Sequence, residues 1–356
     1  MSFPFVQPYF GLGNSLQTAQ ASGGGAVGGW VELARTTLGS AGDVIDVTSL
    51  PDKRYYMFLT SDQNTGNIDF ELTFNADTGS NYARRSSVNG GSDVTSTSQA
   101  NIYMLGGNTV GSAKPTNFVG YIANLPGKEK LIMNHGIFQD NAGAGTAPLR
   151  REEIYKWANT TDPIDQITLT NSSTGSFATG AELVVLGWDP ADTHTTNFWE
   201  ELASVTTGSA GDTLQSGTIS AKKYLWIQAS YKNDGAADIN ALPRFNGDGG
   251  ANYSKRTSTN GAADNTRTSR TWVDIESGNQ RARFANMFII NNASNEKLCI
   301  FNQMDYGASG ASTAPNRIEG VAKWANTSDQ ITSIQWNQLD AGDYAAGAEL
   351  RVWGSD

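Results

Sequence analysis

The chain has 356 residues, with 35 acidic against 25 basic side chains and a formal net charge of −10 at pH 7. This length predicts about two domains, each large enough to bury a core of its own. Nucleic-acid binding needs clustered Lys and Arg, and no basic run occurs; no stretch approaches the roughly 18 apolar residues of a membrane span either, so we expect neither partner.

The first 29 residues carry aromatic side chains without an apolar period. Phe3, Phe5, Tyr9 and Phe10 are unfavourable in water, and a flexible glycine-rich hinge follows them at residues 21–29. At roughly 1.5–3 kcal/mol for each buried aromatic side chain, four of them suffice to hold a segment on a surface. We therefore predict an extended N-terminal docking arm, which packs either on its own domain or on another subunit.

From residue 30 onward, short apolar stretches alternate with polar residues at a period of two. They are rich in β-branched and aromatic residues and are bounded by Gly, Asn and Asp, which is the pattern of β-strands. The stretch RREEIYKWA at 150–158 is expected to make one or two helical turns at most. The predicted strands are, in chain order, 43–50, 54–61, 67–74, 131–138, 165–171, 181–188, 212–219, 223–230, 238–245, 286–292, 297–303, 331–336 and 348–354.

One phrase occurs twice, as KWANTTDP at 156–163 and as KWANTSDQ at 323–330. Around it, residues 157–189 and 324–356 are identical at 16 of 33 positions. Offsets of 167 to 171 residues indicate that a whole domain was duplicated, since solenoid repeats are much shorter. Further matched pairs are 147–157 with 314–324, 74–87 with 245–258, and 30–43 with 199–212.

The strand pattern and the duplication together predict an all-β chain of two tandem β-sandwich domains, jelly-roll-like in topology, with the N-terminal arm in front. We expect the two copies to share one strand order and to differ in loops such as 89–117 and 260–280. The predicted domains are the docking arm and hinge at 1–29, the first sandwich at 30–189, a linker at 190–198 and the second sandwich at 199–356.

Few residues suggest chemistry. The chain has two histidines, His135 and His194; neither has a counterpart in the other copy, and neither has metal-ligand spacing. Cys299, the single cysteine, lies in the apolar stretch KLCIF and is interpreted as a small buried hydrophobic residue. We expect no catalytic site, no cofactor and no enzymatic activity.

Recurring carboxylates keep an enzyme alternative open. Glu182 and Glu349 recur in GAEL, and Asp162 and Asp329 recur after WANT. Most glycoside hydrolases use a pair of carboxyl groups as their catalytic residues. Since both copies also keep their turns, recurrence alone does not indicate catalysis.

Each copy also has a segment with alternating oxygen-bearing residues, FNADTGSNY and FNGDGGANY. Such spacing resembles part of a calcium loop, but the bidentate Glu of an EF-hand is missing. We favour a strand-ending turn in which Asp and Asn cap backbone amides and Gly79 or Gly250 takes a positive φ. The weak calcium candidates are Asn75, Asp77 and Asn81, with Asn246, Asp248 and Asn252.

Three segments together, RFNGDGGANY, KWANTSDQITSIQW and GDYAAGAELRVWG, resemble a repeat module of tailed-bacteriophage virion structural proteins of the decoration, head-fibre and tail-associated types. The resemblance covers each copy from Trp30 and from Trp199 to its end. The first copy departs from it at Ala76, where the module usually has Gly. The resemblance implies a non-enzymatic β-domain used for assembly or adhesion.

On this basis we expect a structural protein of a bacteriophage virion: a capsid decoration or cement protein, or a minor capsid protein, anchored by its N-terminal arm. Its expected partners are other virion proteins, either the major capsid protein or tail and portal components, and further copies of itself. The alternative is a tail or fibre protein that binds a receptor or a host surface glycan. Trp188, Trp336 and Trp353 are its candidates for stacking on sugars, unless they pack in the sheets.

Overall fold

The computed structural model describes residues 26–27, 29–105, 114–190, 192–194, 196–235, 238–277, 282–305 and 310–356. Phe3, Phe5, Tyr9 and Phe10 of the predicted arm lie outside these ranges. The described chain begins with β1 (Ala26–Val27), which pairs with β14 (Thr193–His194) between the two sandwiches of the sequence. Within the described ranges there is no helix, and so none that would cross a membrane.

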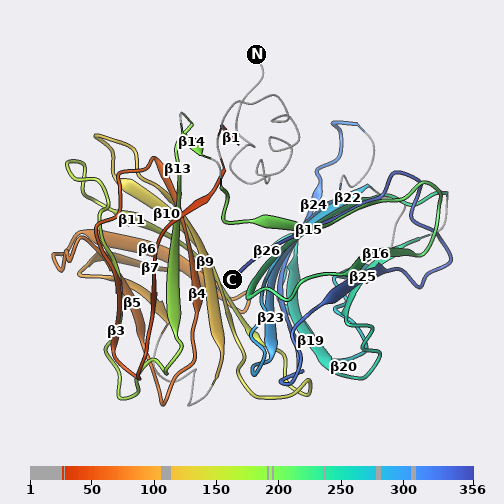
Figure 1. The fold of residues 1–356 in the computed structure, drawn as a ribbon, viewed down its shortest axis with the longest axis horizontal. Helices are drawn as coiled ribbons and strands as arrows, with labels where there is room; N and C mark the ends of the chain where they lie inside the picture. Colours follow the sequence, from red (N-terminus) through yellow and green to blue (C-terminus); the bar gives the residue numbers. More distant parts are fainter. Residues whose placement is uncertain are drawn as a thin grey trace.

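The first sandwich consists of an eight-stranded sheet and a four-stranded sheet, and its registered strand pairs are antiparallel (Figure 1). The larger sheet has the order β2-β13-β4-β9-β10-β11-β6-β7, and the smaller has the order β3-β12-β5-β8. The strands are β2 (Val31–Thr37), β3 (Val44–Val47), β4 (Tyr55–Ser61), β5 (Phe70–Phe74), β6 (Tyr82–Val88), β7 (Val94–Gln99), β8 (Ile102–Leu105), β9 (Thr116–Ala123), β10 (Lys130–Phe138), β11 (Leu149–Trp157), β12 (Ile167–Asn171) and β13 (Glu182–Trp188).

The second sandwich repeats this arrangement strand for strand. Its larger sheet has the order β15-β26-β17-β22-β23-β24-β19-β20, and its smaller sheet has the order β16-β25-β18-β21. The strands are β15 (Glu200–Thr206), β16 (Thr213–Thr218), β17 (Tyr224–Tyr231), β18 (Asn240–Phe245), β19 (Tyr253–Thr259), β20 (Asn265–Arg270), β21 (Glu276–Ser277), β22 (Arg283–Ile290), β23 (Lys297–Asp305), β24 (Asn316–Trp324), β25 (Ser333–Asn337) and β26 (Glu349–Ser355).

The predicted fold class is therefore confirmed: two tandem sandwiches with one strand order. Within each, successive strands alternate between the sheets β2-β13-β4-β9 and β3-β12-β5-β8, which is jelly-roll topology extended at one side by the hairpins β6–β7 and β10–β11. The prediction of a helical turn at residues 150–158 was wrong. Residues 150–157 belong to strand β11, in which the charged side chains of Arg151 and Glu153 point into the sandwich and obscure the alternation of apolar and polar residues.

The recurring tryptophans lie at equivalent points of the two cores, as their repetition predicts. Trp157 is 0% exposed and Trp324 is 1% exposed. The Trp157 indole N–H donates to Asp77 (2.6 Å), and that of Trp324 donates to Asp248 (2.7 Å). The two segments that recur in the sequence, FN-D-NY and KWANT, thus meet and hold each other in both sandwiches.

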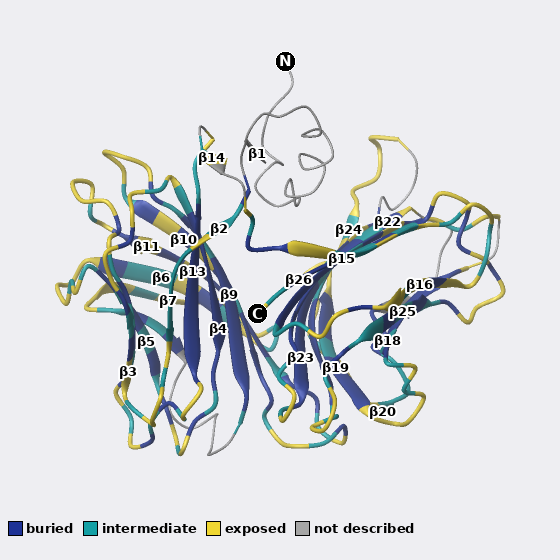
Figure 2. Cartoon of the chain, in the orientation of Figure 1, coloured by how far each residue is buried: buried dark blue, intermediate teal, exposed yellow. Residues whose placement is uncertain are grey.

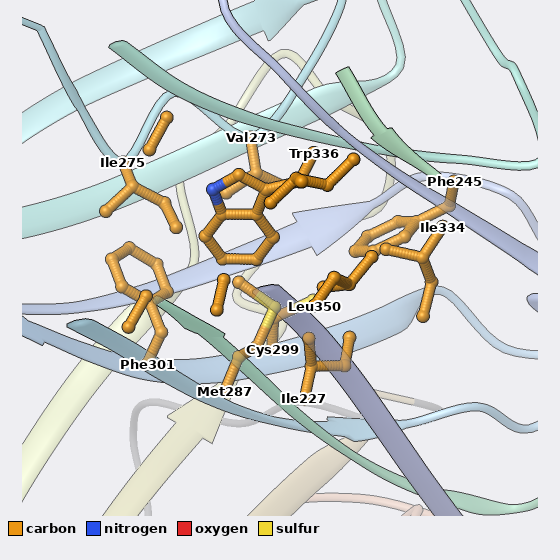
Figure 3. Close-up of a cluster of buried hydrophobic side chains, with 14 of the residues drawn as sticks. Ile227, Phe245, Val273, Ile275, Met287, Cys299, Phe301, Ile334, Trp336 and Leu350 are labelled. Atoms are coloured by element: carbon orange, nitrogen blue, oxygen red, sulfur yellow. The ribbon is translucent and has the colours of Figure 1, made fainter. Parts of the chain in front are cut away.

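The core of the second sandwich also buries Trp336 and Cys299, both 0% exposed, among aliphatic and aromatic side chains (Figure 3). Cys299 is thus the buried hydrophobic residue that its sequence context predicts. Burial alone raises the pKa of its thiol far above the ordinary value, so it stays protonated and unreactive.

The turn after β5 has a strained residue that the turn after β18 avoids. Asn75 and Ala76 both take positive φ, of 52° and 54°, where the second copy has Asn246 and Gly247 at 51° and 66°. Gly79 and Gly250, the glycines expected at positive φ, do not have it. A residue with a Cβ is disfavoured in this region by roughly 1–2 kcal/mol, and glycine is not.

Because of that difference, we expect Ala76→Gly to raise the free energy of unfolding by about 1 kcal/mol. Gly247→Ala in the equivalent turn should lower it by a similar amount. Urea unfolding of both variants checks this. A change of the same sign in both would contradict the assignment of strain to Ala76.

Candidate functional site

The two eight-stranded sheets face each other across a shared apolar layer. Buried side chains of β4, β9, β10 and β13 pack against those of β17, β22, β23, β24 and β26, so the centre of the molecule is buried (Figure 2). This outer-face cluster is distinct from the two sandwich cores. It consists of Met57, Leu59, Val119, Ile137, Val184 and Leu186 with Phe198, Trp199, Tyr224, Trp226, Phe288, Ile290, Leu298, Ile300, Val321 and Trp353.

One end of this interface is closed by polar contacts around Glu182. The Tyr224 hydroxyl donates to Glu182 (2.7 Å), and Lys223 Nζ lies 3.0 Å from the same oxygen. Burial raises the pKa of Glu182, but hydrogen bonds from Thr37 and Tyr224 outweigh it and lower the pKa overall. A carboxylate that is 3% exposed and held by these donors fastens the second sandwich to the start of β13.

A second seam runs along the loop between β10 and β11. The Arg256 guanidinium donates to the carbonyl of Pro148 (2.8 Å), and the Ser254 hydroxyl donates to that of Thr146 (3.0 Å). Lys323 is 0% exposed and donates to the carbonyl of Gln139 (3.3 Å). The loop of the first sandwich therefore lies along β19 and β24 of the second.

At the opposite end, the two sheets leave a cavity of about 420 Å³ between them. Aromatic and aliphatic side chains form about half of its wall, and the polar side chains are one His, three Asn, one Gln, one Arg and one Glu. Its lining residues are Val119, Tyr121, Met133, Asn134, His135, Phe284, Asn286, Phe288, Ile300, Asn302, Gln303, Met304, Arg317 and Glu319. We call this cavity and its rim the cleft.

The polar part of the cleft comes from equivalent positions of the two repeats. His135 on β10 faces Glu152 on β11, and Asn302 on β23 faces Glu319 on β24. Burial raises the pKa of Glu319, and the neighbouring Glu152 raises it further against the effect of Arg317 and Arg150. Burial lowers the pKa of His135, so its imidazole is neutral at pH 7.

Arg150 carries the positive charge beside these carboxylates. Its guanidinium lies 2.6 Å from Asp264 and 3.6 Å from Glu319, both of the second sandwich, and it also pairs with Glu152. Burial lowers the pKa of Arg150, but the hydrogen bond with Asp264 and the three carboxylates outweigh it and raise the pKa. These side chains thus form an interlocked charge cluster, which reaches the cleft through Glu319.

The rim of the cleft is apolar and exposed. Leu131, Met133 and Ile154 on the outer face of β10 and β11 are 56%, 42% and 52% exposed, and Met304 on β23 is 48% exposed. Large apolar side chains are usually covered in a single chain. The repeat counterparts Leu298, Ile300 and Val321 are 0%, 4% and 1% exposed, because the first sandwich covers them.

The structure corrects two of the three glycan candidates. Trp336 is in the core of the second sandwich, and Trp353, at 6% exposure, is in the outer-face cluster, so neither ring is open to a sugar. Trp188 is half-buried and stacks on Tyr55, with ring centroids 5.3 Å apart.

The calcium candidates form hydrogen-bonded turns. Asp77 accepts from the amide of Gly79 (2.8 Å) and from the Asn81 side chain (2.9 Å), in addition to Trp157. The Asn75 side chain spans to the chain around Pro163 and Asp165. Asp248 and Asn252 repeat the first of these contacts, and Asn246 repeats the second. The side-chain oxygens of Asn75, Asp77, Asn246 and Asp248 therefore already accept hydrogen bonds from the protein, while Asn81 and Asn252 act as donors.

The remaining sequence candidates are scattered. Asp162 and Asp329 are exposed and accept from Asn159 and Asn326 within their own turns. Glu349, at the start of β26, pairs with Arg351 (3.2 Å), whereas Glu182 is held at the closed end of the interface. In the part of the chain that the structure describes, no group of three or more His, Cys, Asp or Glu side chains is arranged to hold a metal ion. Glu152, Glu319 and Arg150 were not candidates in the sequence, because they come together only when the two sheets pack.

The sequence matches no family model and no curated protein. Among solved structures, mouse laminin α1 domains LG4-5 align over 91% of this chain and 90% of that chain, at 9% identity and a TM-score of 0.19. Pseudomonas aeruginosa OccK9 (OpdG) aligns over 84% and 96%, at 9% identity and a TM-score of 0.12. A FadL homologue of the same organism aligns over 86% and 91%, at 8% identity and a TM-score of 0.08. Scores this low carry no argument about fold or function.

Arg150 gives a test of the interface. Removal of one partner of a buried ion pair leaves the other charge uncompensated, so we expect Arg150→Ala to lower the free energy of unfolding by about 3–5 kcal/mol. The matched control is Arg85→Ala, whose pair with Asp93 is about half exposed on both sides, and which should cost less than about 1 kcal/mol. Urea unfolding measures both; equal losses would contradict the role given to Arg150.

The buried carboxyl group of Asp62 predicts how the stability of the fold depends on pH. It is 3% exposed beside the closed end, and burial raises its pKa to about 7 against the lowering effects of Thr60 and Lys223. The folded state therefore keeps a proton that the unfolded state loses above about pH 4, so this group lowers stability as pH rises from about 4 to 7.

Asp62→Asn removes this effect. We expect the variant to match the original protein at pH 4 and to exceed its unfolding free energy by roughly 2–4 kcal/mol at pH 8. Calorimetric unfolding of both proteins across this range makes the comparison. A constant difference between them at all pH values would refute the assignment.

Proposed function

We propose that the chain is a non-enzymatic structural protein of a bacteriophage virion, acting as a capsid decoration, cement or minor capsid protein that attaches through its N-terminal arm. Its partners would be the major capsid protein or tail and portal components. The observation that carries the proposal is the joining of two duplicated sandwiches into one block by a buried outer-face cluster.

The packing favours a rigid rather than a mobile arrangement of the two sandwiches. Two domains that move on each other usually share a small polar interface, whereas these share an aromatic and aliphatic layer closed by the Glu182 and Arg150 contacts. The smaller sheets lie on the two sides away from this layer (Figure 1). The block therefore offers two similar surfaces at a fixed separation, which favours multivalent attachment.

The sequence resemblance to virion repeat modules adds the second support, since two of the three segments that carry it have structural roles here. The FN-D-NY turn and the KWANT phrase meet through the Trp157–Asp77 and Trp324–Asp248 hydrogen bonds. They would be kept by any protein built on this module, whatever its place in the particle. These motifs therefore do not indicate a position in the virion, and the proposed attachment depends on the arm.

The alternative, a tail or fibre protein that binds a receptor or a host glycan, retains one of its three stacking candidates. Trp188, stacked on Tyr55, is half-buried at the end of β13. Trp188→Ala with a glycan array tests it: loss of glycan binding with unchanged particle attachment would favour the alternative.

The arm is the anchor to test. We expect a protein that starts at Gly28 to fold and yet fail to co-sediment with particles that lack the protein. A full-length variant with Phe3, Phe5, Tyr9 and Phe10 changed to Ser should fail in the same way, because ordering an arm of this length opposes binding by roughly 1–2 kcal/mol per residue unless its aromatic side chains are buried.

The full-length protein is the positive control, and circular dichroism with thermal unfolding checks that both variants fold. Equal co-sedimentation of all three proteins would mean that the arm is not the anchor. Attachment would then have to reside on the faces of the sandwiches.

A further inference from the structure

The described chain enters the molecule at the wall of the cleft. After β1 pairs with β14, Trp30 packs against the outer-face cluster, and its ring lies 6.4 Å from that of Tyr121. Tyr121 lines the cavity. The carbonyl of Trp30 accepts from the amide of Phe198 (2.8 Å), so this entry point is fixed by the linker as well. Trp30 therefore lies beside the cleft, and β1 precedes it by three residues along the chain.

The chemistry of that preceding segment matches the rim. Residues 1–25 contain no Asp, Glu, Lys, Arg or His, and they carry four aromatic side chains within the first ten positions. The rim offers Leu131, Ile154 and Met304, each about half exposed. An uncharged aromatic segment is the kind of ligand that such a surface buries favourably, because both expose apolar area to water when they are apart.

In the second repeat, the equivalent apolar side chains are covered by protein. Leu298 and Val321, the counterparts of Leu131 and Ile154, are at most 1% exposed because the first sandwich lies on them. In the part of the chain that the structure describes, no third sandwich lies on the row of the first repeat. An apolar segment outside the two repeats is therefore the element of this sequence that is suited to cover it.

The tether favours the same molecule over a second one. Residues 11–25 separate Phe10 from β1, and a flexible glycine-rich chain of about 15 residues has a root-mean-square span of roughly 21 Å. A tethered segment so close to its site has an effective concentration in the millimolar range. At lower protein concentrations, the arm of a second copy is the weaker competitor.

We propose that the N-terminal arm, residues 1–25, docks by its aromatic side chains into the cleft of its own molecule, against the apolar row of Leu131, Met133 and Ile154. The inference goes beyond the proposed function. It gives the arm a resting site in the free protein, which a virion partner would have to displace, and its test uses no particles.

Disulfide trapping in the full-length chain tests the proposal. Ile154→Cys is combined in turn with Phe3→Cys, Phe5→Cys, Tyr9→Cys and Phe10→Cys, and each pair is oxidised briefly and run on a non-reducing gel. Cys299 is fully buried and does not interfere. The matched control puts the second cysteine at Leu339, which is 60% exposed and follows β25 on the second sandwich.

We expect at least one arm position to form an internal disulfide with residue 154, at least about tenfold faster than with residue 339, reflecting the local concentration in the cleft. Ile154 is exposed, so its substitution leaves the fold intact, and Leu131→Cys provides a second rim position with the same expectation. Denaturant should abolish the preference for the rim.

Two results would overturn the proposal. Equal rates at the rim and at Leu339 for every arm position would show that the arm does not dock in the cleft. Cross-linked dimers in place of internally linked monomers would show that the arm enters the cleft of a second copy. Neither result bears on particle attachment, so the co-sedimentation experiment remains a separate test.

Discussion

The packing of the two outer faces is the constraint on which the rest of the structure depends. An antiparallel sheet can leave one face to water only if that face is polar, and the larger sheets here carry apolar residues on both faces. Packing outer face on outer face buries Leu298, Ile300 and Val321 and brings Arg150 to Asp264. The polar seams and the cleft arise from this packing, and neither sandwich would have them by itself.

Because of the same packing, the repeated segment KWANT lies in two different environments. Trp157 and Trp324 lie in equivalent core positions, but Lys156 is about half exposed and pairs with Glu129, whereas Lys323 is fully buried beside Glu296 and the loop of the other sandwich. Burial lowers the pKa of Lys323, and Glu296 opposes that change. The duplication thus kept the inward contacts and let the outward ones differ.

The period of two and the internal repeat were enough to predict the all-β fold and its duplication, because both are properties of local sequence. Strands β6 and β7 were not predicted, since YARRSSV and VTSTSQ are largely polar and show no apolar alternation, and β11 was misread because Arg151 and Glu153 turn inward. The cleft lay beyond sequence reasoning because it depends on how two outer faces meet. The one available signal was LIMNHGIF, in which outward positions 131 and 133 are apolar like the inward ones.

The difference between the two ends of the interface has a cause in single residues. At the closed end, Tyr224 reaches Glu182, and the neighbouring strand β26 ends in the small Ser355. At the corresponding end of the first sandwich, Tyr55 stacks on Trp188, the counterpart of Ser355, and its ring is engaged there. A stack of two rings therefore stands where the second closing contact would have to form. The tyrosine that closes the interface in the second sandwich thus makes a different contact in the first, although Tyr55 and Tyr224 are repeat counterparts.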